Sequence, residues 1–254
     1  MMVVRTATSE APFYHSVKER LTAHEDLFHI PVADIDLYLQ RNFLSGEECI
    51  ALIEAIDAEN EPSLVLGYER QIDFRSSDSS NLTGAADLVQ QISQRIDRFL
   101  GIDPRFGEPI GGVRYAPGQE FKPHFDWIDP STPYWPAQDL VGGQRTWSVI
   151  ICLSQPESGG GTMFPEVGVR LHPRAGNLIT WCNLSANGAP NRLTLHCGEP
   201  VEAGTKYILS KWYRSRPFTP PAVSQQLPAS EQLKQLGLTP YQPAEGTDHA
   251  RINA

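Results

Sequence analysis

Residues 113–127 read VRYAPGQEFKPHFDW and place His124 and Asp126 two positions apart. If this run is a β-strand, side chains two positions apart point to the same face of the sheet. An imidazole nitrogen and a carboxylate oxygen then converge on one point, as metals of hard to borderline character require. A pair of this kind also occurs by chance, so a third ligand elsewhere in the chain has to support a metal site.

Length and composition describe an ordinary globular protein. The 254 residues are enough for one large domain with a full core, or for two small ones. The net charge of −9 argues against a nucleic-acid surface, which needs clustered Lys and Arg, and against anionic membranes. No apolar run approaches the ~20 residues of a membrane span, and the N-terminus lacks a signal-peptide core. We therefore expect a cytoplasmic protein that binds neither nucleic acid nor membranes.

The four cysteines, Cys49, Cys152, Cys182 and Cys197, lie far apart and form no C-x-x-C pair. This spacing favours reduced, partly buried thiols over a disulfide framework or a zinc site.

Two amphipathic helices are predicted before the motif, over residues 45–59 and 84–100. The first opens on an S-x-x-E capping box formed by Ser45 and Glu48. Residues 36–43 are typical of a short strand entering a helix, and residues 64–74 are compatible with another strand. Residues 1–34 are weakly patterned and form a predicted N-terminal extension, whose histidines lack the neighbours of metal ligands. The apolar positions at helical spacing are Cys49, Ile50, Leu52, Ile53 and Ile56 in the first helix, where we expect them to form the buried face, and Leu88, Ile92, Ile96 and Phe99 in the second.

From residue 111 to residue 216, short β-rich runs alternate with Gly/Pro turns. Eight or so strands at this spacing favour a mainly β sandwich or jelly-roll barrel with flanking helices. We expect the main domain to cover residues 35–216, with its β core at 111–216 and a Pro-rich tail at 217–254 that has one short helix at 230–236. The runs are GGVRY, EFKPHFDW, RTWSVIICL, GTMF, VGVRLH, NLITWC, RLTLH and KYILSKWY.

Three histidines downstream of the motif compete to be the third ligand. His249 lies in the polar tail, and His172 precedes a proline at a strand end. His196 ends the run RLTLH, where alternation places it on the face opposite Leu193 and Leu195. His196 is therefore the favoured third ligand. Two histidines and one carboxylate that bind one face of an iron ion leave three of its coordination positions open.

Lys206 is the second chemical signal, because it lies in the mostly apolar run KYILSKWY. A buried unpaired charge is costly, so this lysine needs an anionic partner. The distal carboxylate of a bound 2-oxoglutarate is one such partner, and exposure on an edge strand is the alternative. Lys211 and Arg214 in the same run are expected to face solvent.

Several motifs in this order resemble the prolyl 4-hydroxylase branch of the Fe(II)/2-oxoglutarate dioxygenases. The resemblance covers about residues 37–213 and implies a double-stranded β-helix (a cupin-like jelly roll) with flanking helices. It also implies Fe(II), 2-oxoglutarate and O2, with ascorbate as a reductant. The matching segments are NFLSGEEC, the R-x-S segment at Arg75, GVRYAPGQEFKPHFDW, GGQRTWSVIICL, GGGTMFPEVGVRLHPRAGNLITW and the run from His196 to Trp212.

The resemblance implies roles for individual residues. His124, Asp126 and His196 match the iron ligands, and Lys206 matches the partner of the 2-oxoglutarate distal carboxylate. Members that halogenate lack the carboxylate that Asp126 supplies, so its presence implies hydroxylation.

Four further residues match positions around the same centre. Tyr115 and Thr162 match hydroxyl groups near the distal carboxylate, and Trp212 matches an aromatic residue beside the iron. Arg145 matches a basic residue at the substrate entrance. Tyr115 and Trp212 are also compatible with core aromatics, and Arg145 with a plain surface arginine.

Three functions remain open at this stage. The first is hydroxylation of peptidyl proline or a related protein residue, with release of succinate and CO2. The second is hydroxylation of a free amino acid or small metabolite, and the third is a non-catalytic cupin-like metal-binding or oxygen-sensing module. Tyr134 and Trp135, between prolines in the connection 128–143, are candidate substrate contacts. The sequence is compatible with either a monomer or a homodimer.

Overall fold

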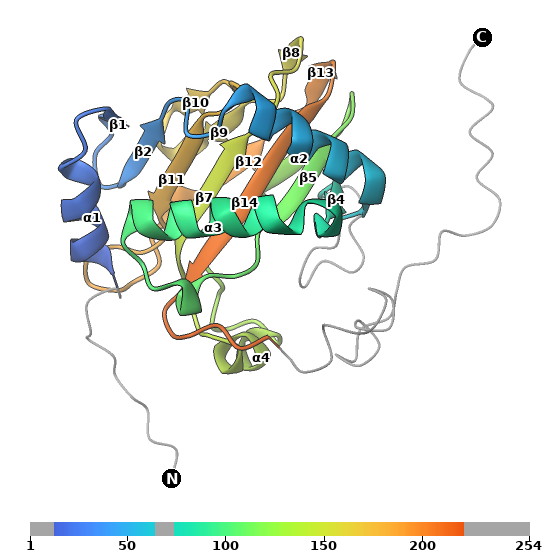
Figure 1. Ribbon diagram of the computed structural model, residues 1–254. Coiled ribbons are helices and arrows are strands. Elements are labelled where there is room, and N and C mark those ends of the chain that lie inside the picture. Colours follow the sequence, from blue (N-terminus) through green and yellow to red (C-terminus); the bar gives the residue numbers. More distant parts are fainter. Residues whose placement is uncertain (1–12, 64–73, 221–254) are drawn as a thin grey trace.

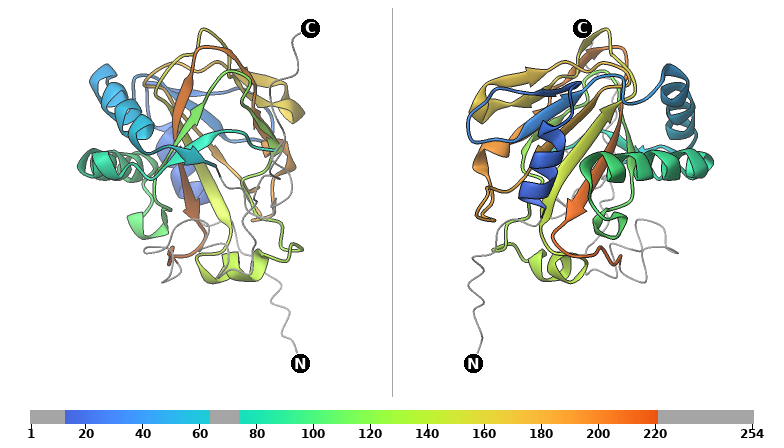
Figure 2. Two further views of the ribbon diagram at one scale, coloured as in Figure 1. Left: turned by 90° about the vertical axis from the view of Figure 1, so that its right-hand side faces the viewer. Right: turned by 60° about the vertical axis from the view of Figure 1, so that its left-hand side comes forward.

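A computed structural model describes residues 13–63 and 74–220 of the chain. In this part of the chain an eight-stranded antiparallel sheet faces a smaller four-stranded sheet, and helices cover the outer face of the larger sheet (Figures 1 and 2). This is the predicted mainly β architecture with flanking helices. None of the helices in the described residues is long and apolar enough to cross a membrane.

The larger sheet has the strand order β1-β2-β11-β7-β14-β5-β4-β3. Strands β7 and β14 form its centre, and their side chains alternate between the helices on one face and the smaller sheet on the other. The bounds are β1 Leu27–His29, β2 Leu37–Gln40, β3 Glu61–Pro62, β4 Asp78–Ser80, β5 Gly111–Tyr115, β7 Arg145–Cys152, β11 Leu178–Cys182 and β14 Lys206–Arg214.

The smaller sheet has the order β10-β9-β12-β6, and a separate two-stranded ladder joins β13 to β8. The bounds are β6 Phe121–His124, β8 Ser158–Gly159, β9 Thr162–Phe164, β10 Val169–Leu171, β12 His196–Gly198 and β13 Val201–Ala203. Short 3-10 turns lie at η1 Thr83–Ala85, η2 Pro104–Phe106, η3 Pro165–Val167 and η4 Arg192–Thr194.

Helices α2 (Gly46–Glu59) and α3 (Ala86–Leu100) lie across the outer face of the larger sheet (Figure 1). The predicted capping box opens α2: Ser45 Oγ accepts from the Glu48 amide at 3.1 Å, and the Glu48 carboxylate accepts from the Ser45 amide at 2.9 Å. Ile50 was predicted to be buried, but 59% of it is exposed. It lies on the solvent side of α2, because the buried face of this helix centres on Leu52 and Ile56.

The beginning of the described chain joins the same core. Helix α1 (Tyr14–Thr22) buries Val17 and Leu21 in the cluster that contains the α2 and α3 core residues. Strand β1 then pairs with β2 at the edge of the larger sheet. Part of the expected N-terminal extension is therefore packed against the domain. The possible strand at 64–74 falls almost wholly outside the described residues, and the predicted helix at 230–236 falls entirely outside them.

Two strand predictions are wrong in detail. The run RLTLH is not a strand: Arg192–Thr194 form the turn η4, which the side chain of Asn191 caps by accepting from the Leu193 amide at 3.0 Å. His196 therefore begins strand β12 instead of ending a strand. Strand β6 ends at His124, so Asp126 lies just beyond the strand and not within it.

Candidate active site

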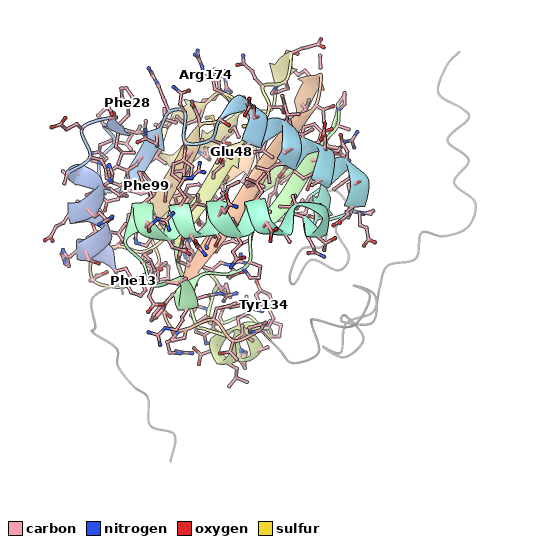
Figure 3. The ribbon with its side chains drawn as sticks, viewed as in Figure 1. Phe13, Phe28, Glu48, Phe99, Tyr134 and Arg174 are labelled. Atoms are coloured by element: carbon pink, nitrogen blue, oxygen red, sulfur yellow. The ribbon has the colours of Figure 1, made fainter. Side chains whose placement is uncertain are left out.

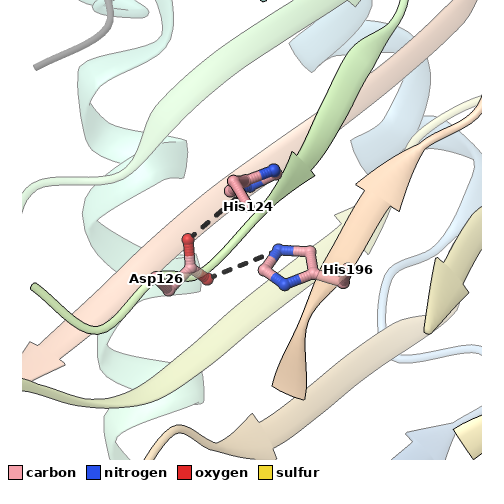
Figure 4. A group of neighbouring side chains, drawn as sticks. All are labelled: His124, Asp126 and His196. Atoms are coloured by element: carbon pink, nitrogen blue, oxygen red, sulfur yellow. Dashed lines mark ion pairs between the residues drawn. The ribbon is translucent and has the colours of Figure 1, made fainter. Parts of the chain in front are cut away.

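His124, Asp126 and His196 come together between strands β6 and β12 (Figure 4). His124 ends β6, and His196 lies directly opposite it at the start of β12. The Nε2 atom of His124 lies 3.9 Å from Asp126 Oδ1, and the Nε2 atom of His196 lies 3.8 Å from Asp126 Oδ2. Within the described residues this is the one group of three or more His, Cys, Asp or Glu side chains with metal-binding spacing.

The two imidazole rings are oriented by backbone carbonyls. His124 Nδ1 lies 2.7 Å from the Lys122 carbonyl oxygen, and His196 Nδ1 lies 2.9 Å from the Thr194 carbonyl oxygen. A carbonyl only accepts, so each Nδ1 carries the hydrogen and each Nε2 keeps a free lone pair toward Asp126. This tautomer is the one that a metal ligand needs.

The charge states also suit a divalent metal. Burial, with the neighbouring His196, lowers the pKa of His124 to about 3, so its ring is neutral at physiological pH. Burial raises the pKa of Asp126, but His196, His124 and Arg145 outweigh this effect and lower the pKa overall. A neutral His124 ring and an ionised Asp126 carboxylate, beside the Nε2 atom of His196, belong to the set of two histidines and one carboxylate that is typical of non-haem Fe(II) sites. The residues present therefore fit the implied iron.

A pocket opens beside these three residues. The predicted residues Lys206, Tyr115, Thr162 and Trp212 all line it together with the three candidate ligands. Its remaining walls come from Arg75, Val113, Phe121, Val149, Ile150, Cys197, Gly198, Ile208 and Ser210.

Lys206 lies in this pocket as an unpaired cation. It begins β14 opposite Tyr115 of β5, and only 2% of it is exposed. Its Nζ lies 5.4 Å from the centre of the Tyr115 ring and makes no ion pair with the described residues. Burial lowers the pKa of Lys206, because the charged form is removed from water without a carboxylate in contact. An anionic ligand would supply the missing partner.

Arg145 lies behind the pocket wall. Its guanidinium stacks at 3.9 Å on the ring of Trp212, which does line the pocket. It also donates two hydrogen bonds to the buried carboxylate of Glu108, at 2.7 and 2.8 Å. Arg145 is therefore neither a plain surface residue nor part of the pocket lining.

Lys211 and Arg214 were expected to face solvent, and this expectation is wrong. Only 3% of Lys211 and 2% of Arg214 is exposed. Lys211 Nζ lies 2.8 Å from a carboxylate oxygen of Asp97 on α3, and Arg214 Nε lies 2.5 Å from Glu108. Both partners lie far away in the sequence, so the strand pattern alone does not reveal them.

Tyr134 and Trp135 do not line the pocket. Trp135 begins the short helix α4 (Trp135–Leu140), and both side chains are half-buried near the end of the molecule where α4 lies (Figures 1 and 3). Their contact with a substrate stays a prediction. The connection that carries them is tied to β14, because Arg214 donates to Gln138 at 2.9 Å.

Two pocket residues were not assigned a role from the sequence. Phe121 stacks on the His124 ring with 3.5 Å between ring centres, and Arg75 lies 4.8 Å from the Phe121 ring centre. The R-x-S pattern was the signal for Arg75, whose segment pairs with β6 through the bridge between Arg75 and Phe121. For Phe121 the signal was its position in β6, on the same strand as His124.

Comparison with known proteins agrees with this geometry. Residues 110–214 match the 2OG-Fe(II) oxygenase superfamily. Prolyl 4-hydroxylase subunit alpha-1 of Mus musculus is 33% identical over 153 residues, which are 60% of this chain and 28% of that protein. Probable prolyl 4-hydroxylase 9 of Arabidopsis thaliana is 29% identical over 201 residues, which are 69% of this chain and 67% of that protein.

The fold leads to the same group. The crystal structure of the viral collagen prolyl hydroxylase of Paramecium bursaria Chlorella virus-1, in complex with 2OG, superposes with a TM-score of 0.55 and 26% identity. The match covers 70% of this chain and 95% of that one. The chain spans only 28% of the length of the animal alpha-1 subunit that it matches. Fold, motif order and sequence similarity together show that residues 110–214 form a domain of the 2OG-Fe(II) oxygenase superfamily, similar to that of its prolyl 4-hydroxylase-like branch.

Proposed function

We propose that this protein is an Fe(II)- and 2-oxoglutarate-dependent hydroxylase that acts on peptidyl proline or a related residue. The observation that carries the proposal is one pocket with two complementary features. The His-Asp-His group offers three metal ligands, and the unpaired cation of Lys206 lines the same pocket. This arrangement suits a small dianion that chelates a metal through one end and presents a carboxylate at the other.

In this proposal, His124, Asp126 and His196 hold the iron through two Nε2 atoms and one carboxylate oxygen. Iron bound with 2-oxoglutarate and O2 supplies the oxidising power, and succinate and CO2 are the coproducts. Lys206 pairs with the distal carboxylate through a charge-assisted contact, and the Tyr115 and Thr162 hydroxyls donate to it. Ascorbate would serve only to keep the iron reduced.

The walls of the pocket exclude water and orient the substrate. Trp212 and Phe121 cover the centre with apolar surface, and the stack of Arg145 on Trp212 holds that indole in place. We infer that Arg145 influences substrate entry through its stack on Trp212, and that Tyr134 and Trp135 contact the part of the substrate that lies outside the pocket. A peptidyl prolyl substrate is supported by the similarity to proteins named as prolyl 4-hydroxylases and as a collagen prolyl hydroxylase.

Succinate release tests this proposal. The protein is incubated with Fe(II), 2-oxoglutarate and O2, together with either proline-containing peptides or free amino acids. We expect peptide-dependent succinate and a peptide mass increased by one oxygen atom. Hydroxylation of free amino acids alone would contradict the substrate class and leave the reaction type intact.

A pair of histidine variants tests the site. His124→Ala should abolish turnover and metal binding, because one of three ligands is lost. His172→Ala removes an exposed histidine that does not line the pocket, and this variant should retain turnover and metal binding. Normal turnover in His124→Ala would refute the assignment.

A further inference from the structure

Asp126 is held by two buried polar side chains that the sequence did not single out. Ser148 Oγ donates to Asp126 Oδ2 at 2.6 Å, and Asn183 Nδ2 donates to Ser148 Oγ at 2.8 Å. The exposed fractions of Asp126, Ser148 and Asn183 are 7%, 1% and 0%. The three residues come from different parts of the chain: Asp126 lies just beyond β6, Ser148 in the middle of β7, and Asn183 directly after β11.

The direction of this chain of hydrogen bonds is determined by chemistry. The amide nitrogen of Asn183 can only donate, so the Ser148 oxygen has to accept. The hydroxyl hydrogen of Ser148 is then left for the Asp126 carboxylate, which is the stronger acceptor. In the opposite orientation of the Asn183 side-chain amide, its oxygen would face Ser148 and attract the hydroxyl hydrogen away from Asp126. The Asn183 NH2 group would then occupy the buried position where the oxygen now has no hydrogen-bond partner. Buried N–H groups without partners are rarer than under-satisfied oxygens.

The surroundings leave Ser148 little freedom. In the sheet it lies directly between Trp181 of β11 and Trp212 of β14. The Trp181 ring packs against His196 with 4.8 Å between ring centres, and Trp212 lines the pocket. The backbone N–H of Asn183 donates to the Thr146 carbonyl oxygen at 2.8 Å. Thr180 Oγ1 donates to the Ser148 backbone carbonyl oxygen at 2.8 Å, not to its side chain. Ser148, the donor to Asp126, is therefore positioned by the central strands of the larger sheet.

One oxygen of Asp126 is thus occupied and the other is available. Oδ2 accepts from Ser148, whereas Oδ1 accepts no hydrogen bond from the described residues. We propose that Ser148 and Asn183 are positioning residues that form a one-way hydrogen-bond relay, which locks the orientation of Asp126 so that a single oxygen is presented to the metal. The inference rests on the metal site of the proposed function and adds how its carboxylate ligand is held.

Metal affinity of the metal-free protein tests the relay without any turnover. Mn(II) is the probe, and its dissociation constant is measured by titration calorimetry. Partners that support a metal ligand typically contribute 10- to 100-fold to affinity. We expect Ser148→Ala to weaken Mn(II) binding by about tenfold or more, and Asn183→Leu to weaken it less, because the Ser148 hydroxyl remains but loses its direction.

Thr180→Val is the matched control. It removes an equally buried hydroxyl that bonds to the Ser148 backbone but not to the carboxylate, so it should leave the dissociation constant within about twofold of wild type. The melting temperature of each metal-free variant shows whether it is folded. If Ser148→Ala does not fold, Ser148→Cys keeps the side-chain size with a weaker donor and should show an intermediate loss of affinity.

The double variant distinguishes a relay from two separate effects. If Asn183 acts through Ser148, then Asn183→Leu adds nothing to Ser148→Ala, and the double variant binds Mn(II) as weakly as Ser148→Ala alone. Additive losses would overturn the relay, and so would wild-type affinity in folded Ser148→Ala. Failure of the wild type to bind Mn(II), or binding unchanged by His124→Ala, would instead refute the metal site of the proposed function.

Discussion

Two lysines on strand β14 show that the role of a buried charge depends on the groups that face it. Lys206 and Lys211 are both buried, with exposed fractions of 2% and 3%. Lys211 points toward α3, where it contacts Asp97 at 2.8 Å and Ser93 at 2.5 Å. Lys206 points into the pocket, where the described residues offer it no carboxylate in contact. The same residue type therefore forms a structural ion pair at one position and is a buried cation without an ion pair to the described residues at the other, where we propose that it binds an anion.

Replacing each lysine by methionine should shift stability in opposite directions. Removal of the uncompensated charge in Lys206→Met should raise the free energy of unfolding of the ligand-free protein by about 1–4 kcal/mol. Lys211→Met should lower it by about 3–5 kcal/mol, because Asp97 loses its cation in a buried site. Urea unfolding at neutral pH measures both effects. If both variants change the free energy of unfolding in the same direction, the charge of Lys206 has a compensating partner in the folded protein.

The lowered pKa of Lys206 predicts a pH dependence. Burial holds this pKa below the ordinary value of 10.5, so at basic pH the unfolded chain binds more protons at this residue than the folded chain. Stability then rises with pH wherever this difference exists. The destabilisation is fully present below the folded pKa and is relieved as the pH rises toward 10.5. We expect the stability difference between Lys206→Met and wild type to be largest at neutral pH and to shrink by pH 10, as measured by urea unfolding. A constant difference would contradict the lowered pKa.

At the scale of elements, the close approach of α2 to β5 depends on a glycine. A Cβ atom at Gly112 would lie 2.6 Å from Cγ1 of Ile56, which is fully buried in α2. Helix α2 therefore rests on β5 with no space for a side chain at this point. This contact holds the helix against the strand that carries Tyr115 into the pocket.

Gly112→Ala should accordingly lower the free energy of unfolding by about 1–3 kcal/mol, through overpacking of the contact between α2 and β5. Gly46 in the first turn of the same helix has open space around its Cβ position. Gly46→Ala should leave stability unchanged or raise it by up to about 1 kcal/mol. Thermal unfolding of the two variants compares them directly. Equal stability would mean that α2 shifts away from β5 without cost.

At the scale of the whole molecule, the first described helix is part of the domain. Leu21 and Val17 are buried in the main core, Arg20 Nε donates to the Phe99 carbonyl oxygen at 3.0 Å, and Lys18 pairs with the buried Asp36 at 2.8 Å. These contacts connect α1 to α3 and to the segment before β2. The helix should therefore unfold together with the rest of the domain.

Leu21→Ala tests this cooperativity. Creating a cavity at a fully buried leucine should cost about 2–5 kcal/mol, in one transition detected equally by helix and tryptophan signals. Ile50→Ala alters an isoleucine of α2 that is 59% exposed and should change stability by less than about 1 kcal/mol. A separate early transition in Leu21→Ala would show instead that α1 is an independent unit.

Short-range patterns in the sequence are enough to predict the local elements and to select the candidate site residues. The capping box at Ser45 and Glu48, the two long helices and most strands of the β core follow from short-range patterns, and the structure contains them. His124, Asp126, His196 and Lys206 could be selected because each is a polar residue in an otherwise strand-like run, and they do line one pocket. Motif order then predicted the superfamily that the comparisons show.

What each of these residues faces depends on how the elements pack, which the sequence patterns do not reveal. The pairing of His124 with His196, the burial of Lys211 and Arg214, the stack of Arg145 on Trp212 and the relay from Asn183 through Ser148 to Asp126 all join residues that are distant in the chain. Periodicity reports on which side of its own element a residue lies. It contains no information on which other element covers that side, and burial and charge compensation are set by that covering element.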